Sequence, residues 1–118
     1  MKSRELNKKL LELIPEIKPL YEEETSWQEG HDTGSHVVFS DVLFPYLIDN
    51  LKKNNEATIH ICFKAIEEIL NLKDEYADEV IVISILENLS YEEFEFDKMV
   101  SYMQKNTKKL YEEVANYE

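Results

Sequence analysis

The stretch Glu79–Leu89, Glu-Val-Ile-Val-Ile-Ser-Ile-Leu-Glu-Asn-Leu, constrains the fold more than any other part of the chain. Seven of its eleven residues are large and apolar, and they do not keep to one face. The β-branched run Val80–Ile83 by itself favours a strand. However, Asp74–Asn88 contains no Gly or Pro, and a segment of about 15 residues is long for a strand and ordinary for a helix. Because Asp74 is a good N-cap and acids follow it, we predict a buried helix from Asp74 to Leu89.

A second helix is expected to begin directly after this one. Ser90 and Glu93 have the spacing of a capping box, and Leu89 and Phe94 have the spacing of a hydrophobic staple. The pattern therefore predicts that the central helix stops at Leu89 and that the next helix starts at Ser90.

Apolar residues at helical spacing predict helices along the rest of the chain. Pro45 determines where the third predicted helix begins. A proline at this position would break a helix that runs from Ser35, but it fits the first turn of a helix that starts near Asp41. The other predicted helices are 3–14, a helix from Pro15 or Pro19 to just before Gly30, 55–70 and one from Thr107 onward.

The predicted architecture is all-α, with about seven helices in antiparallel α-α pairs. A chain of 118 residues is long enough for one domain, residues 1–118. Two glycines and three prolines are too few for the turns of an all-β fold, and short links make consecutive helices antiparallel. Two arrangements fit these features, a short HEAT-like solenoid and an orthogonal helical bundle.

The formal net charge of −12 restricts the classes of partner. Nucleic acids and anionic membranes are bound through Lys and Arg, so neither is expected, whereas a basic protein would be attracted. The single cysteine, Cys62, allows no intramolecular disulfide and fits a reducing compartment. No signal-peptide core or transmembrane run is apparent in the sequence, so we expect a cytoplasmic protein.

Three potential metal ligands, His31, Asp32 and His36, lie close together in the clearest loop of the chain. Zinc sites favour Cys-rich sets or two His residues four apart on a helix, and this trio has neither pattern. A polar loop is the better interpretation, and we predict no metal and no cofactor.

Three further residues are candidates for catalytic groups. Cys62 stands on an apolar stripe, which indicates a core residue rather than a nucleophile. Glu87 and Asp41 are acids in apolar surroundings and would suit an acid/base pair, but a solvent-exposed helix edge for Glu87 and a helix cap for Asp41 explain them more simply. We therefore predict no catalytic residue and no enzymatic activity.

Acidic residues are dense on both sides of the link between the helices 55–70 and 74–89. In an antiparallel pair they would surround the shared turn and form one negative patch, which we expect to bind a basic partner. The residues of this patch are Glu67, Glu68, Asp74, Glu75, Asp78 and Glu79.

Several apolar motifs resemble a family of small, acidic, all-helical bacterial proteins, some of which are immunity proteins of polymorphic or contact-dependent toxin systems. The motifs are His36–Phe39, Pro45–Leu47, Ala65–Leu70 and Val82–Leu89, and the resemblance runs roughly from Leu13 to Tyr111. It implies a cytoplasmic protein that binds and blocks a toxin domain, and it carries over no functional residue. A helical scaffold or regulatory domain is the alternative, followed by a small metal-binding protein or enzyme.

Overall fold

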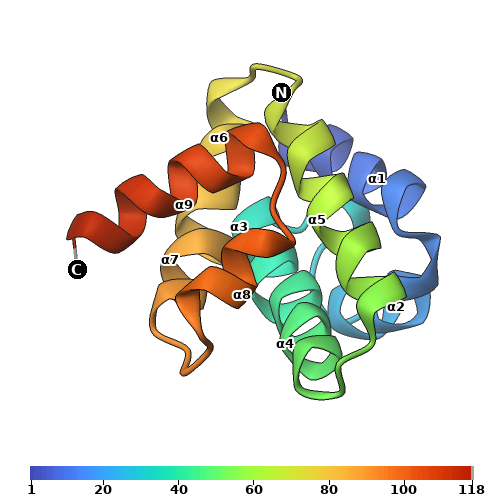
Figure 1. Cartoon of the computed structure of the whole chain (residues 1–118). Helices are drawn as coiled ribbons and strands as arrows, with labels where there is room; N and C mark the ends of the chain where they lie inside the picture. Colours follow the sequence, from blue (N-terminus) through green and yellow to red (C-terminus); the bar gives the residue numbers. More distant parts are fainter. Residues whose placement is uncertain (118) are drawn as a thin grey trace.

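The structure, a computed structural model, describes residues 1–117, and within them every regular element is a helix (Figure 1). Several elements are continuous with their neighbours, so that these residues form about seven helical rods, which confirms the predicted all-α class. In chain order the elements are α1 (Ser3–Leu13), η1 (Pro15–Ile17), α2 (Lys18–Thr25), η2 (Gly30–Asp32), α3 (Ser35–Val38), η3 (Phe39–Leu43), α4 (Phe44–Lys52), α5 (Glu56–Leu70), α6 (Glu75–Val80), η4 (Ile81–Leu86), α7 (Glu87–Ser90), α8 (Phe96–Ser101) and α9 (Lys105–Tyr117).

The central apolar stretch is a helix, as predicted, formed by α6, η4 and α7 in one continuous rod. Asp74 caps its start, since Asp74 Oδ2 accepts a hydrogen bond of 2.9 Å from the Ala77 amide. Glu79, Ile83 and Glu87 recur every four residues and form its partly exposed edge, on which Ile83 is 45% exposed. The buried positions of the rod are Val80, Ile81, Ser84, Ile85, Leu86 and Leu89.

The prediction that a new helix starts at Ser90 is wrong. The Ser90 hydroxyl donates to the Glu87 carbonyl at 2.6 Å, inside the helix that is ending. A serine hydroxyl readily bonds a carbonyl one turn back along its own helix, so it is not available to cap the next one. Residues 91–95 are irregular, and α8 begins only at Phe96.

The predicted start of the third helix at Asp41 is also wrong, because α3, η3 and α4 run without a break from Ser35 past Pro45. The reason lies in η3, a π-helical turn in which the Phe44 amide bonds the Phe39 carbonyl five residues back. In a regular α-helix the ring of Pro45 would meet the carbonyl of Asp41. The wider π-turn just before the proline relieves this conflict and lets the helix continue.

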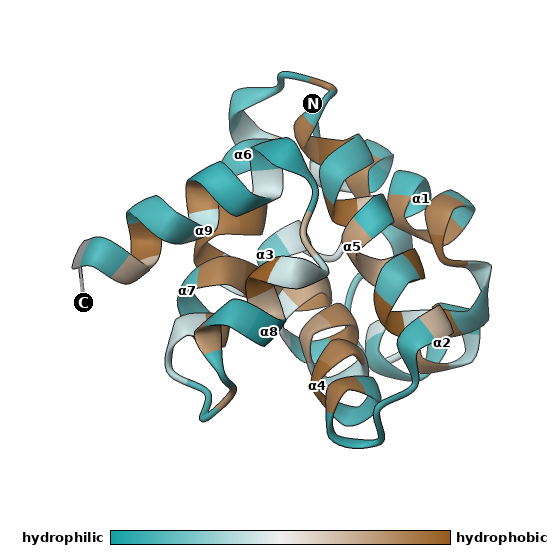
Figure 2. Cartoon of the chain, viewed as in Figure 1, coloured by the Kyte–Doolittle hydropathy of each residue, from teal (hydrophilic) through white to brown (hydrophobic). Residues whose placement is uncertain are grey.

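The rods form a bundle rather than a solenoid. In a solenoid each repeat contacts only its neighbours along the chain, whereas here α5 contacts α1 and α9, and η3 contacts η4. Figure 1 shows α5 between α9 and α1. Hydrophobic residues concentrate on the helices in the middle of the molecule, including α4, while the link from α4 to α5 is hydrophilic (Figure 2).

Candidate functional site

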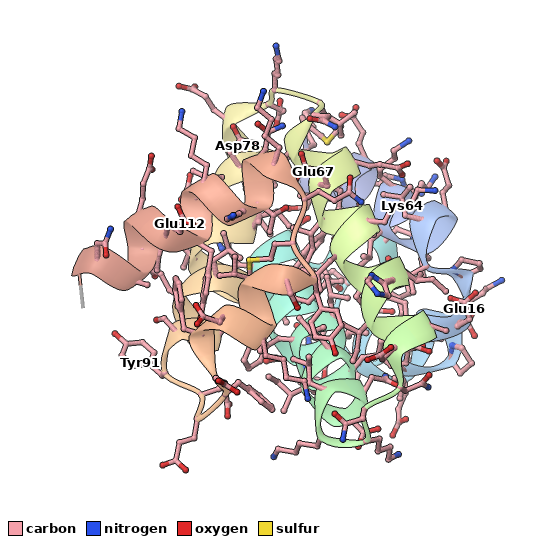
Figure 3. All side chains as sticks on the ribbon, viewed as in Figure 1. Glu16, Lys64, Glu67, Asp78, Tyr91 and Glu112 are labelled. Atoms are coloured by element: carbon pink, nitrogen blue, oxygen red, sulfur yellow. The ribbon has the colours of Figure 1, made fainter. Side chains whose placement is uncertain are left out.

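Glu67, a member of the predicted acidic patch, lies in the interior. It is 5% exposed, and its two carboxylate oxygens accept from the Thr107 amide (2.9 Å), the Thr107 hydroxyl (2.9 Å) and the Asn106 amide (3.1 Å). Figure 3 shows it at the end of α5, beside the start of α9. The first backbone N–H groups of α9 have no carbonyl partner within the helix, and a carboxylate at this position accepts hydrogen bonds from them. Its negative charge also complements the helix dipole. Glu67 is therefore an internal cap, and its assignment to an exposed surface is corrected.

Two more acids of that patch also have contacts or surroundings set by the protein itself. Besides capping α6, Asp74 bonds the N-terminal ammonium group of Met1 at 2.9 Å. This bond lowers the pKa of Asp74, and the Ala77 amide lowers it further. Burial raises the pKa of Asp78, as does the nearby charge of Asp74, and Asp78 Oδ1 is buried with no hydrogen-bond partner among the described residues.

The remaining members of the predicted patch, Glu68, Glu75 and Glu79, reach solvent to different degrees. Glu75 and Glu79 are exposed and Glu68 is half-buried. Glu79 is also engaged, since its Oε1 lies 3.8 Å from Nε2 of His36. A partner-binding role for these three stays a prediction, on a much smaller surface than the sequence suggested.

The potential metal ligands of the loop are directed to different neighbours. His31 Nδ1 lies 2.7 Å from the Tyr21 hydroxyl, and Asp32 pairs with Arg4 at 3.2 Å. His36 instead lies against the central rod. Among residues 1–117, no group of three or more His, Cys, Asp or Glu side chains is placed to hold a metal ion.

His36 stands between a serine and a carboxylate of the central rod. Its Nδ1 lies 3.1 Å from Ser84 Oγ and its Nε2 lies 3.8 Å from Glu79 Oε1. The order of groups is that of a serine hydrolase, but a nucleophilic hydroxyl must meet its substrate, and Ser84 is 3% exposed. The contact therefore joins α3 to the central rod. Glu87 lines the shallow groove beside it and Asp41 lines a different groove, so the two acids form no pair.

Cys62 is a core residue, as predicted. Its side chain is fully buried, and burial, with a smaller contribution from Glu16, raises the pKa of the thiol to about 12. At neutral pH such a thiol is protonated and is a poor nucleophile.

A groove of about 370 Å³ between α2, with the turn that follows it, and η3–α4 combines apolar surface with acidic residues. We call it the Trp27 groove. No Lys, Arg or His is among the described residues that line it. These residues are Leu20, Glu23, Glu24, Trp27, Asp41, Val42, Pro45, Tyr46 and Asp49.

Trp27, the only tryptophan of the chain, is 72% exposed at this groove. Leu20 beside it is 45% exposed. Tryptophan is enriched at the energetic centres of protein interfaces, and a large exposed aromatic surface in a concave site is typical of them. The sequence analysis missed Trp27, because apolar periodicity does not single it out. The signal that could have found it is the position of a lone Trp in the polar turn Thr25–Gln28.

The acids of the groove differ in what they already bind. Asp49 forms an ion pair with Lys53 at 2.9 Å, and Glu24 accepts from Gln28 at 2.6 Å. Asp41 Oδ1 accepts a hydrogen bond of 3.3 Å from the Ser40 hydroxyl, but neither Asp41 nor Glu23 pairs with a cation among the described residues. The groove therefore keeps negative charge for a ligand from outside.

A protein-family model, Domain of unknown function (DUF7674), matches residues 7–118. The chain belongs to this family. The match includes the Trp27 groove, the Glu67 cap and the His36–Ser84 contact. No curated protein and no solved structure matches the chain.

For this DUF7674 chain, the geometry of its own residues is what indicates the site. Within the described residues, no helix combines the length and the apolar character needed to cross a lipid bilayer. The Trp27 groove is the best candidate site, since it joins concave shape, exposed aromatic surface and unpaired charge.

Proposed function

We propose that this chain is a cytoplasmic protein-binding module with a basic partner, and specifically an immunity-type inhibitor that neutralises a toxin domain by steric and electrostatic occlusion. The observation that supports the proposal is the Trp27 groove, where an exposed indole and a leucine share the lining with Glu23 and Asp41, which pair with no cation among the described residues. The net charge of −12 supports the same class of partner.

The mechanism follows from the two kinds of surface in the groove. Long-range attraction between the acidic chain and a basic partner speeds their encounter, an effect that salt weakens. Burial of the exposed faces of Trp27 and Leu20 in the complex then supplies affinity, because water leaves the apolar surface. A bound module of this size covers the partner's surface and so blocks access to it.

The proposal is tested with the C-terminal domain of a large secreted toxin from a neighbouring reading frame, and the lack of any such reading frame would count against the immunity function. The domain is expressed in cells with and without this chain, and the purified pair is studied by calorimetry and stopped-flow kinetics. We expect rescue of growth, a stable complex and an association rate that falls steeply with salt. Failure to bind and to protect would overturn the immunity function. Binding without protection would favour the scaffold alternative.

A further inference from the structure

We infer that the Trp27 groove is an arginine-recognition site, which takes the guanidinium group of an arginine side chain from the partner protein. This inference rests on the proposed function and names the chemistry of its binding site.

The charge of the groove is complementary to that of a guanidinium group. Glu23 on α2 and Asp41 on η3 line the groove from two different elements, and neither pairs with a cation in the described part of the chain. A cationic side chain in the groove would lie between carboxylates that approach it from two sides. Charge-assisted hydrogen bonds of this kind are stronger than neutral ones.

The exposed indole favours arginine over lysine. Trp27 is 72% exposed and offers a flat ring face, and tryptophan is the best aromatic partner for a cation. A guanidinium group is planar and weakly hydrated, so it stacks on such a face and still directs N–H groups to carboxylates. An ammonium group is a compact, strongly hydrated charge and gains less from the ring.

The groove also has a surface for the aliphatic part of an arginine side chain. Leu20, Val42 and Pro45 give the groove apolar surface beside its acids. The methylene groups of an arginine are suited to such a surface, while the charged end reaches the carboxylates. Two wider grooves, of about 530 and 500 Å³, each have a basic side chain in their lining, among them Lys18 in the first and Lys52 in the second, and so lack this complementarity.

A titration with short peptides tests the inference without any partner protein. Three capped peptides differ only in one residue, which is arginine, lysine or citrulline, the neutral analogue of arginine. Because Trp27 is the only tryptophan, its fluorescence reports the groove directly. We expect saturable binding of the arginine peptide, weaker binding of the lysine peptide and no binding of the citrulline peptide.

Variants locate the binding in the groove. The double variant Glu23→Gln/Asp41→Asn should weaken the arginine peptide by about tenfold or more, since it removes both unpaired charges. Its matched control is Glu113→Gln/Asp97→Asn, which makes the same charge change at exposed positions on α9 and α8 and should leave the affinity nearly unchanged. Trp27→Ala, followed by calorimetry, should abolish measurable binding.

Two results would overturn the inference: equal binding of the citrulline peptide, or equal losses in the groove variant and its control. Failure of the proposed function is separate. If the chain binds the arginine peptide in the groove but does not block the toxin, the arginine site stands and the immunity function is overturned. If the Trp27→Ala variant neutralises the toxin as well as the unchanged chain does, the immunity function stands and the arginine site in the groove is overturned.

Discussion

Two acidic regions of this molecule use their carboxylates in opposite ways. Around the turn from α5 to α6, Glu67 and Asp74 are bound to backbone amides and to the N-terminal ammonium group. In the Trp27 groove, Glu23 and Asp41 pair with no cation in the described part of the chain and line the same groove as an exposed indole. The density of acids along the chain therefore does not locate an interface. What locates it is whether the carboxylates are already bound to backbone amides or cations of the protein itself.

The largest expected effect on folding comes from Glu67→Ala. Without the carboxylate, two amides and the buried Thr107 hydroxyl at the start of α9 lose their acceptor. We expect the free energy of unfolding to fall by about 2–4 kcal/mol, measured by urea denaturation. Glu68→Ala, on the same helix, should cost about 0.5 kcal/mol or less. Equal effects of the two substitutions would remove the distinction between the two acidic regions.

Trp27→Ala should have the reverse profile, with a loss of binding and little loss of stability. Its indole is mostly in solvent, so the free energy of unfolding should change by about 0.5 kcal/mol or less. Affinity for the toxin domain should fall by about tenfold or more, roughly 1.4 kcal/mol, measured by calorimetry. Tyr91→Ala, at a residue with the same 72% exposure, serves as the control. A Trp27→Ala variant that unfolds more easily but binds normally would make Trp27 a structural residue.

Asp74→Asn tests the internal use of charge through its dependence on pH. The pKa of Asp74 is lower in the folded protein than in the unfolded chain, so its stabilising contribution is fully present above the unfolded pKa. The contribution is lost as pH falls through the lowered, folded pKa. We expect the variant to be less stable at neutral pH and the difference to shrink in acid, measured by denaturation at a series of pH values. A difference that does not change with pH would show that the charge is unimportant.

The smallest expected effect is a gain in stability from Asp78→Asn. Burial raises the folded pKa of Asp78 above its unfolded value, so the ionised carboxyl destabilises the fold above the unfolded pKa, and this cost disappears in acid. The variant should be more stable by a few tenths of a kcal/mol near neutral pH, a size appropriate to a partly exposed group. The same pH series measures it. A loss of stability at neutral pH would mean that the charge of Asp78 has a favourable partner.

Sequence reasoning succeeded for local features and failed where a residue had a choice of partner. Asp74 caps the central helix and Cys62 lies in the core, as expected. Ser90 matched a capping box but bonds its own helix, and Pro45 is tolerated inside a helix because a π-turn precedes it. For the candidate site, the sequence indicated an acidic binding surface but did not select Glu23, Asp41 or Trp27.

The sequence by itself determined that the chain is helical, acidic and built around the apolar segment after Asp74, because these properties depend on composition and on spacing along one segment. The tertiary structure alone decided which charges remain unpaired. Glu67 meets the start of α9 some forty residues later in the chain, while Glu23 and Asp41 meet no cation among residues 1–117. Whether a carboxylate acts as a cap or stays open to a ligand depends on which distant donors the fold brings to it. The sequence around the carboxylate does not predict such long-range contacts.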